Sequence, residues 1–246
     1  MLRLLVAAIF IIFGVILCMP YHLYLKSVAK KDTYKGWTKS WRFVRKVFRG
    51  MLKIAGTDIE LRGLENLDKV PKEQGILFVG NHRSYFDILT LQTVVDRPMG
   101  FIAKKELKKV PLFWRWMDDI GCLFLDRANV RASMETINTG IEYMKQGLSL
   151  GLFPEGTRNH GSELKAFKPG GYRMAEKSNS AIIPVALTGL DNILENNKPI
   201  ALKKCHVVIE FGEPTYPHEL ENKARKEYYS SIPTTIQTML DSHNNN

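Results

Sequence analysis

Two short polar clusters follow apolar, strand-like runs, and the first of them could do acid–base chemistry. The run Gly75–Gly80 leads into His82, and Asp87 follows five residues later. In open α/β sheets the reacting groups gather beyond the carboxyl ends of the strands, which is where His82 is expected. A turn from strand to helix, capped by Ser84, would bring the Asp87 carboxylate to one imidazole nitrogen. The other nitrogen could then take a proton from a hydroxyl, which predicts a general base with an orienting acid and no built-in nucleophile.

The same residues also fit a purely structural interpretation. Ser84 and Asp87, ahead of the apolar pair Ile88-Leu89, have the spacing of a helix capping box. A single histidine at the end of a strand is often only a hydrogen-bonded residue of the fold. Taken alone, the spacing leaves both interpretations of His82 open.

The second cluster, Phe153–Arg158, has the sequence FPEGTR and also follows an apolar run. Gly156 lets the backbone approach a ligand closely, Thr157 offers a hydroxyl, and Arg158 offers a planar fork of donors that suits a phosphate. These residues predict an anion-binding turn. Alternatively, Glu155 and Arg158 form an ion pair across an ordinary surface turn.

A third cluster adds positive charge between the other two. Lys105 begins a segment that leads to Pro111, and the predicted strand Cys122–Leu125 ends in Asp126 and Arg127. Lys105 and Arg127 could reach the same sheet edge as the first two clusters. As single residues, both fit a solvated or structural role equally well.

Beyond residue 56, short β-rich runs alternate with helical patterns, which predicts an α/β domain with a mainly parallel sheet flanked by helices. The predicted strands are Asp58–Arg62, Gly75–Gly80, Cys122–Leu125, Ser149–Phe153, Ala181–Leu187 and His206–Phe211. The predicted helices are Tyr85–Val95, Val130–Gln146 and Gly171–Lys177, with another after His218. Pro184 inside one predicted strand indicates an edge or an irregularity in the ladder.

Together these clusters resemble the motifs of the 1-acyl-sn-glycerol-3-phosphate acyltransferases, a family within the glycerolipid acyltransferase superfamily. The resemblance runs from about Gly75 to Val185 with the motifs in order. NHxxxxD alone is a weak signal, but FPEGTR some 70 residues later makes the combination specific. The matching segments are Asn81-His82 with Asp87 for NHxxxxD, Phe153–Arg158 for FPEGTR, Lys105–Arg127 with Pro111 and Gly121 for the second motif, and Ile183–Val185 for the fourth.

The resemblance implies transfer of a fatty acyl group from an acyl-CoA or acyl carrier protein thioester to the sn-2 hydroxyl of lysophosphatidate, giving phosphatidate without a metal or another cofactor. It implies His82 as the base and Asp87 as its orienting acid. The expected substrate-binding residues are Glu155, Gly156, Thr157 and Arg158, together with Lys105 and Arg127. The expected partners are membrane lipids, lysophosphatidate and the acyl donor, and no nucleic acid.

Two other functions remain open on the sequence. A sister acyltransferase could use another lysophospholipid, glycerol 3-phosphate or an amino-lipid as acceptor. A non-enzymatic membrane tether could be built on the same fold, although the intact pair of His82 and Asp87 speaks against it. Release of CoA or carrier protein in a detergent extract would separate an enzyme from a tether.

The net charge of +10 is confined to the N-terminal segment. Residues 1–53 contain eleven Lys and Arg but a single acid, Asp32, whereas residues 54–246 contain 24 bases and 24 acids. A basic stripe on one terminal segment indicates a surface-docking element, while a nucleic-acid-binding domain would be basic throughout.

The N-terminal segment is also the most apolar part of the chain. Leu4–Met19 is an apolar run of sixteen residues, close to the lower limit for a membrane span of about 20 residues. No small-x-small cleavage site follows it, so we expect a retained membrane anchor. The basic residues after the run would keep the rest of the chain on the cytoplasmic face. We therefore predict membrane-anchoring helices over residues 1–55 and a catalytic domain over residues 56–246.

A helical face with tryptophans follows the apolar run. Trp37, Trp41, Val44, Phe48, Met51 and Ala55 recur at spacings of three and four, with basic residues on the opposite side. Such a helix fits the plane of an anionic bilayer. The alternative is an ordinary helix packed on the core.

Other candidate sites are excluded by their context. Gly147–Gly151 spells G-x-S-x-G, but a predicted helix precedes Ser149 and a strand follows it, the reverse of a hydrolase nucleophile elbow. The three cysteines, Cys18, Cys122 and Cys205, form no disulfide framework or zinc motif, which favours a reducing compartment. Four further histidines lack metal-ligand spacing and are interpreted as structural or exposed; they are His160, His206, His218 and His243.

Overall fold

The protein is built around one seven-stranded sheet, seen in a computed structural model that describes residues 2–110, 112–161 and 163–244. The strand order is β1-β7-β6-β2-β5-β3-β4. Every neighbouring pair is parallel except β6 and β7, which run antiparallel. The strands are β1 (Asp58–Arg62), β2 (Ile76–Gly80), β3 (Met99–Lys104), β4 (Leu123–Leu125), β5 (Ser149–Leu152), β6 (Ala181–Thr188) and β7 (His206–Phe211). The predicted mainly parallel, mixed sheet is confirmed.

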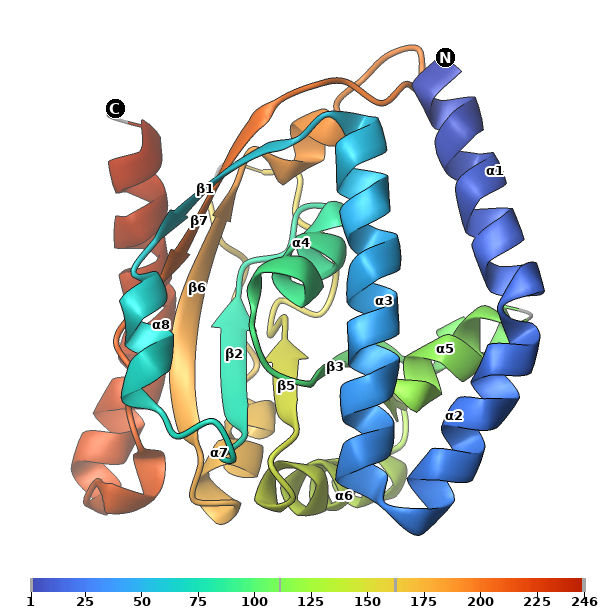
Figure 1. Ribbon diagram of the computed structural model, residues 1–246. Helices are drawn as coiled ribbons and strands as arrows, with labels where there is room; N and C mark the ends of the chain where they lie inside the picture. The colour runs from blue at the N-terminus through green and yellow to red at the C-terminus, as the bar shows by residue number, and fades with distance from the viewer. Residues whose placement is uncertain (1, 111, 162, 245–246) are drawn as a thin grey trace.

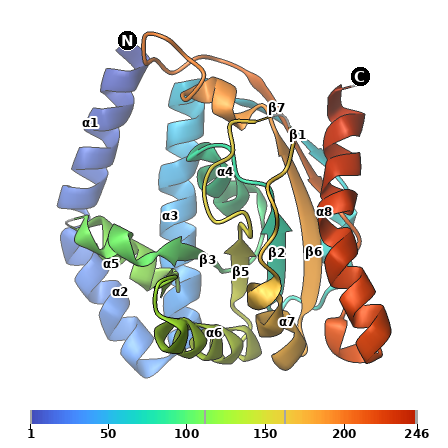
Figure 2. The same cartoon turned by 180° about the vertical axis from the view of Figure 1, so that it is seen from behind.

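Helices cover both faces of this sheet. The α-helices are α1 (Leu2–Leu17), α2 (Met19–Lys31), α3 (Thr33–Ala55), α4 (Phe86–Val94), α5 (Phe113–Asp119), α6 (Val130–Lys145), α7 (Arg173–Lys177) and α8 (Asn222–Asn244). Short 3-10 helices are η1 (Leu64–Lys69), η2 (Lys105–Lys109), η3 (Pro169–Tyr172), η4 (Leu190–Ile193) and η5 (Pro217–Glu219). Helices α3 and α4 lie on the face nearest the viewer in Figure 1, and α6, α7 and α8 lie on the face seen in Figure 2.

Alternating side chains of each central strand fill the two resulting core layers. In β2, Ile76 and Phe78 join the layer under α3 and α4, whereas Leu77 and Val79 join the layer under α6, α7 and α8. Because both faces are buried, the strand is a continuous apolar run, as expected for a parallel strand. Strands β2 to β6 all run in the same direction, so their carboxyl ends meet at one edge of the sheet.

Among the described strands and α-helices, two were not predicted, the strand β3 and the helix α5. β3 contains Gly100, whose added Cβ would lie 2.5 Å from the carbonyl oxygen of Gly121. Only glycine fits this close backbone approach, and glycine within a strand lowers the β-propensity by which the strand would be recognised in the sequence. Helix α5 has only seven residues, too few for a clear helical period. Pro111, assigned to the second motif, lies outside the described residues.

Pro184 occupies an interior strand, so the predicted edge position is wrong and the predicted irregularity is confirmed. β6 pairs with β2 along one side, and its ladder with β7 begins only at Val185, opposite Phe211. Pro184 accepts a hydrogen bond from the Gly212 N–H at 2.8 Å. The missing N–H of Pro184 therefore falls where the antiparallel ladder breaks, which is where a proline costs least.

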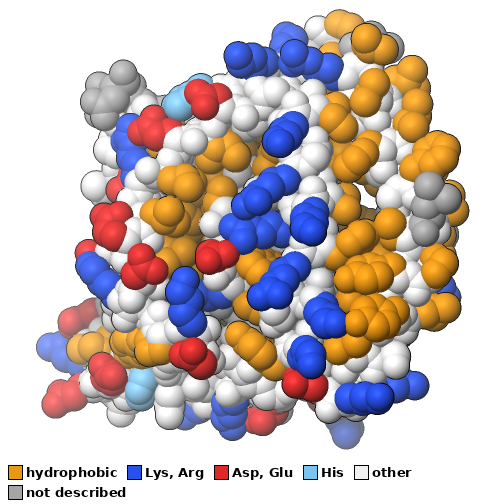
Figure 3. All heavy atoms as spheres, viewed as in Figure 1, with side chains coloured by type: hydrophobic (Ala, Val, Ile, Leu, Met, Phe, Trp, Pro, Cys, Tyr) orange, Lys and Arg blue, Asp and Glu red, His pale blue; other side chains and the backbone are white. Residues whose placement is uncertain are grey.

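The tryptophan face of α3 packs on the core of the protein and not on a bilayer. Trp37 and Trp41 are each only 5% exposed, and Ala55 is fully buried. The interpretation of this face as a bilayer surface is wrong, and the alternative of a core-packed helix holds. The basic side of α3 stays exposed and forms the row of Lys and Arg side chains in Figure 3.

Helix α1 has the exposed apolar surface instead. Ala7 is buried and Phe10 partly buried on the side that packs against the core, while Ile9, Ile12 and Phe13 face outward. Figure 3 shows this apolar surface beside the basic row of α3. Within the described residues no single helix is long and apolar enough to cross a bilayer, but Leu2–Gly14 and Met19–Lys31, bent by 51°, together have the required length and composition. The membrane anchor stays a prediction.

Candidate active site

The predicted pair of His82 and Asp87 forms at the carboxyl end of β2. The Nδ1 atom of His82 lies 2.8 Å from Oδ2 of Asp87. The Oγ atom of Ser84 accepts a hydrogen bond from the Phe86 N–H at 3.0 Å, one residue ahead of Tyr85, the N-cap of α4. Asp87 lies in the first turn of α4 and faces back over the strand end. The turn between strand and helix thus joins two side chains that a straight helix would separate.

Asp87 is held by the backbone as well as by the imidazole. Its Oδ2 accepts the N–H groups of Arg83 and Ser84 at 2.8 and 2.9 Å. The side chain is 0% exposed. Burial raises the pKa of the Asp87 carboxyl, while the bonds from His82 and the two backbone amides oppose that rise. An acid fixed in this way orients the imidazole and stabilises its protonated form.

Glu155 connects the two motif segments through their backbones. Its Oε1 accepts the His82 N–H at 2.9 Å and its Oε2 accepts the Lys165 N–H at 3.1 Å. The Asn159 N–H donates to the carbonyl of His82 at 2.7 Å. Glu155 is 5% exposed. The structure therefore places this predicted substrate-binding residue behind the site, where it fixes the position of His82, and the alternative of an ion pair with Arg158 does not occur.

The His82 ring rests on an aromatic surface. It stacks on Phe153 with ring centroids 4.4 Å apart and planes 15° from parallel. Phe153 in turn lies parallel to Phe101, with centroids 6.3 Å apart. Within the described part of the chain, no group bonds to Nε2 of His82. The imidazole is thus fixed at Nδ1 and on one face, and Nε2 is left for a substrate.

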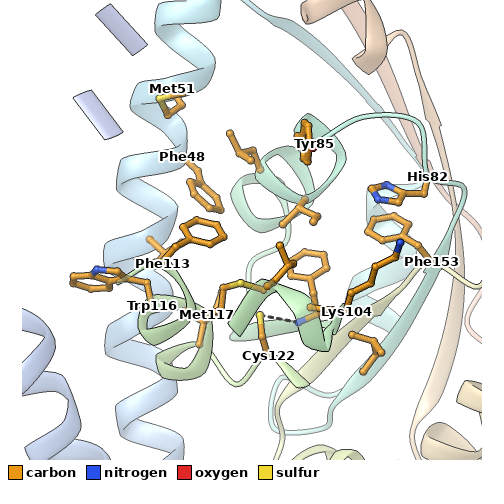
Figure 4. A pocket seen from close by; sticks show the side chains of 18 of the residues that line it. Phe48, Met51, His82, Tyr85, Lys104, Phe113, Trp116, Met117, Cys122 and Phe153 are labelled. Atoms are coloured by element: carbon orange, nitrogen blue, oxygen red, sulfur yellow. Dashed lines mark hydrogen bonds between the residues drawn. The ribbon is translucent and has the colours of Figure 1, made fainter. Parts of the chain in front are cut away.

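His82 lies at the polar end of a large apolar cavity of about 560 Å³. Figure 4 shows the cavity between α3, α4 and α5, with His82 and Phe153 at one end and Phe48, Phe113 and Trp116 toward the other. This volume falls in the usual range for small-molecule sites. Because nearly all of its wall is apolar, the cavity suits a hydrocarbon chain whose reactive end lies at His82.

Positively charged side chains surround the polar end of the cavity. Arg127 lines it and donates to the carbonyl oxygen of Gly156. Gly156 has a φ of 77°, a left-handed backbone conformation that favours glycine. Thr157 also lines the cavity, and its role in substrate binding stays a prediction. Lys105 instead bonds to Asp126 at 2.7 Å, and its neighbour Lys104 lines the cavity (Figure 4).

Arg158 also lines the cavity and is held beside α4. Its guanidinium lies 3.7 Å from the ring centroid of Tyr85, and its Nη2 donates to the Tyr85 hydroxyl at 2.9 Å. Its Nη1 lies 3.4 Å from a carboxylate oxygen of Glu195. These two contacts leave other guanidinium donors for a ligand.

Sequence reasoning missed three residues of this site. Lys104 and Lys105 are adjacent in the sequence, and only the structure shows that Lys104 is the one that lines the cavity. Tyr85 lies inside the first motif, so its position was a usable signal. Glu195 lies in no motif, and nothing local in the sequence indicated it. Among the described residues, no three His, Cys, Asp or Glu side chains gather as a metal site would require.

Comparisons with known proteins show the family of this chain. A family model described as "Acyltransferase" matches residues 59–188. The 1-acyl-sn-glycerol-3-phosphate acyltransferase of Borreliella burgdorferi is 32% identical over 158 residues, which is 64% of this chain and 62% of the relative. That of Saccharomyces cerevisiae is 32% identical over 68% of this chain and 55% of its own length. That of Helicobacter pylori is 32% identical over 70% of this chain and 74% of its own length.

A solved structure shares the whole fold. The crystal structure of the 1-acyl-sn-glycerophosphate acyltransferase PlsC from Thermotoga maritima covers 98% of this chain and 96% of its own chain, with a TM-score of 0.75 and 20% identity. The aligned part of this chain spans 62% and 55% of the length of the first two curated relatives.

Proposed function

Because the chain belongs to the acyltransferase family, we propose that it transfers a fatty acyl group from an acyl thioester to the sn-2 hydroxyl of 1-acyl-sn-glycerol 3-phosphate. The family model matches more than half of the chain, and the relatives at 32% identity carry this activity in their names. One observation carries the proposal: a His–Asp pair with a free imidazole nitrogen at the polar end of an apolar cavity.

The proposed reaction is a direct transfer. Nε2 of His82 takes the proton of the acceptor hydroxyl, whose oxygen attacks the thioester carbonyl carbon. The C–S bond then breaks, and the thiolate of CoA or acyl carrier protein leaves and takes up a proton from His82. Asp87 holds the imidazole in place and stabilises its protonated form between the two steps. The apolar cavity takes a fatty acyl chain, whose carbonyl then lies near His82.

Purified protein in detergent, supplied with a panel of acceptors, tests this proposal. Acyl-CoA and acyl carrier protein donors are each combined with lysophosphatidate, another lysophospholipid, glycerol 3-phosphate and an amino-lipid. We expect lysophosphatidate to give the highest kcat/KM and phosphatidate as the product. A higher kcat/KM with another acceptor would reassign the protein to a sister activity, and no thiol release with any acceptor would favour a tether.

We propose that Arg158 binds the phosphate of the acceptor, with Lys104 at the same end of the cavity. Hydrogen bonds to charged groups contribute about 1.5–3 kcal/mol, so Arg158→Ala should raise the acceptor KM by roughly 10- to 150-fold. Arg158→Lys should rescue only in part, because lysine lacks the planar fork. Lys104→Ala and Lys105→Ala form a matched pair, and only the first should affect the acceptor. An Arg158→Ala effect confined to the thioester donor would move this residue to the donor side.

We propose that α1 and the adjoining surface of α2 dock on the cytoplasmic face of the membrane, with the basic side of α3 near anionic head groups. The support is the exposed apolar surface of α1 beside the exposed Lys and Arg side chains of α3. Deleting residues 1–53 would remove the buried face of α3 and unfold the core. Substitutions on the surface of α1 are the cleaner experiment.

The double variant Ile12→Gln/Phe13→Gln removes two apolar side chains that are 55% and 57% exposed. It should lose most of its binding to vesicles that contain anionic lipid. The control Val130→Gln/Met134→Gln changes two exposed apolar residues of α6, and it should bind as the wild type does. High salt should weaken but not abolish binding, because apolar contacts are not screened. Equal binding by both variants would place the docking surface elsewhere.

A further inference from the structure

A carboxylate outside both motif segments, that of Glu195, holds residues from each of them. Glu195 follows η4, the 3-10 helix that comes after strand β6. Its Oε1 accepts the Tyr85 N–H at 2.8 Å and lies 3.4 Å from Arg158 Nη1. Its Oε2 accepts the Ser84 hydroxyl at 2.9 Å. With a side chain only 9% exposed, Glu195 ties the beginning of α4 to the arginine of the FPEGTR segment.

These contacts fix the plane of the Arg158 guanidinium before a ligand arrives. The guanidinium lies over the Tyr85 ring, bonds to the Tyr85 hydroxyl at one nitrogen and to Glu195 at another. A side chain that is already ordered loses less conformational freedom when it binds. The free donors of Arg158 are therefore aimed at the cavity by its two partners.

We propose that Glu195 is a positioning residue for recognition of the acceptor's phosphate, and that it acts through Arg158. The inference rests on the proposed function, since it assumes that Arg158 binds that phosphate. Glu195 itself does not contact the acceptor, because both of its oxygens already accept hydrogen bonds. Its charge lies at the N-terminus of α4, where the Tyr85 N–H and the helix dipole offset it. Glu195→Gln removes that charge and with it the ion pair that orders Arg158.

Asp191 provides a matched control in the same segment. It lies in η4, is 4% exposed, and accepts a hydrogen bond from Arg83 Nε at 3.1 Å. Asp191 is thus a second buried acid that holds an arginine of the first motif. In the described part of the chain, Arg158 lines the cavity and Arg83 does not. Asp191→Asn and Glu195→Gln remove the same charge, but only the second loosens an arginine of the cavity.

The experiment measures kcat and KM for two acceptors, lysophosphatidate and the phosphate-free 1-acylglycerol. Glu195→Gln should raise the KM for lysophosphatidate roughly 2- to 10-fold, the contribution of one hydrogen bond. The donor KM and both constants for 1-acylglycerol should stay near wild-type values. Asp191→Asn should leave the lysophosphatidate KM unchanged. In the Arg158→Ala background, Glu195→Gln should add no further loss, because the residue through which it acts is gone.

Three results would overturn the role of Glu195 while leaving the proposed function intact. They are an equal loss with 1-acylglycerol, an unchanged or lower KM for lysophosphatidate, and fully additive losses in the double variant. If the wild-type protein does not turn over lysophosphatidate, the proposed function fails instead. The same variants are then compared by equilibrium binding of the two lipids. A loss confined to lysophosphatidate and to Glu195→Gln supports the inference, and equal affinities overturn it.

Discussion

Two of the histidine–aspartate pairs in this molecule join Nδ1 to Oδ2 away from the exposed surface, in different surroundings. His82 and Asp87 are five residues apart and join a strand to the helix that follows it. His22 and Asp119 are 97 residues apart and join α2 to α5. The His82 side chain is 16% exposed and lines the cavity, whereas that of His22 is 3% exposed and lies against Trp116. In both pairs, burial raises the pKa of the aspartate.

The difference shows that the role of such a pair is decided by its second imidazole nitrogen. We call the His82–Asp87 pair open because its second imidazole nitrogen faces the cavity, and the His22–Asp119 pair closed because it is buried. A base must reach the proton that it removes, so only the open pair can serve a substrate hydroxyl. The closed pair of His22 has no such access, and a buried carboxylate paired with an imidazole instead holds two helices together. Helix α5 carries Phe113, Trp116 and Met117 of the cavity wall. The closed pair therefore holds α5, and with it this part of the cavity wall, against the N-terminal helix α2.

Breaking the open pair should have the largest effect. His82→Ala should lower kcat by about 10² to 10⁴, the usual contribution of a positioned base, while circular dichroism shows an unchanged fold. Asp87→Asn should lose most of the activity, and the double variant should be little worse than His82→Ala, because the two side chains act as a unit. Strictly additive losses, or near wild-type turnover by His82→Ala, would remove His82 from the mechanism.

Breaking the closed pair should affect stability more than chemistry. His22→Asn leaves the buried Asp119 carboxylate without its imidazole, which should cost about 1–3 kcal/mol. For a chain of this size, the melting temperature should fall by roughly 2 to 12 °C. The kcat of the folded variant should stay within a fewfold of wild type. A loss of kcat as large as that of His82→Ala, with no change in melting temperature, would contradict the division of roles.

The stability loss of His22→Asn should also depend on pH. A folded-state pKa raised above the unfolded value contributes stability that is present below the unfolded pKa and is lost as pH rises through the folded one. Burial raises the Asp119 pKa, and the His22 bond opposes that rise. Without His22, the loss should therefore be largest at neutral pH and shrink as the pH falls toward about 4, where an unperturbed aspartate titrates. Melting temperatures of wild type and His22→Asn across this pH range measure the pH dependence of the stability loss. When both proteins also carry Asp119→Asn, the stability loss should no longer depend on pH.

Local parts of the open pair were predictable because strand, turn and helix follow one another in the chain. The spacing of His82, Ser84 and Asp87 was enough to place all three. Glu155 and Glu195, which fix the same turn, lie 73 and 110 residues beyond the groups that they hold. No local pattern reports such long-range contacts, and the closed pair of His22 was missed for the same reason.

The helix α3 shows a second limit of sequence reasoning. Its period of three and four residues correctly predicted a helix and the apolar side that includes Trp37 and Trp41. The same pattern arises whether that side faces lipid or a protein core, because both exclude water. Only the packing decides between them, and here the core buries the tryptophans. The fold class and the motif residues could thus be predicted, whereas the surroundings of each apolar face could not.

The smallest effects are expected at the two internal nucleophiles, Ser149 and Cys122, since the open pair should serve only the acceptor's hydroxyl. Ser149 is fully buried, and its Oγ accepts the Ile76 N–H at 3.1 Å. It begins β5, whereas Phe153 follows the end of that strand and stacks on His82. Four residues of extended chain at about 3.3 Å each place Ser149 roughly 13 Å from the site.

Cys122 lines the cavity, so its low reactivity and not its distance from the site keeps it out of the reaction. Its Sγ accepts the Phe101 N–H at 3.3 Å, and burial raises the pKa of the thiol to about 12. The nucleophilic thiolate is therefore scarce at neutral pH. Ser149→Ala and Cys122→Ala should keep most of the wild-type activity, and a labelled acyl donor without acceptor should leave no stable label on the protein. If either residue instead carried stoichiometric label, and if adding an acceptor removed that label, the reaction would proceed through an acyl-enzyme and not by direct transfer. The open pair would then activate a side chain of the protein itself.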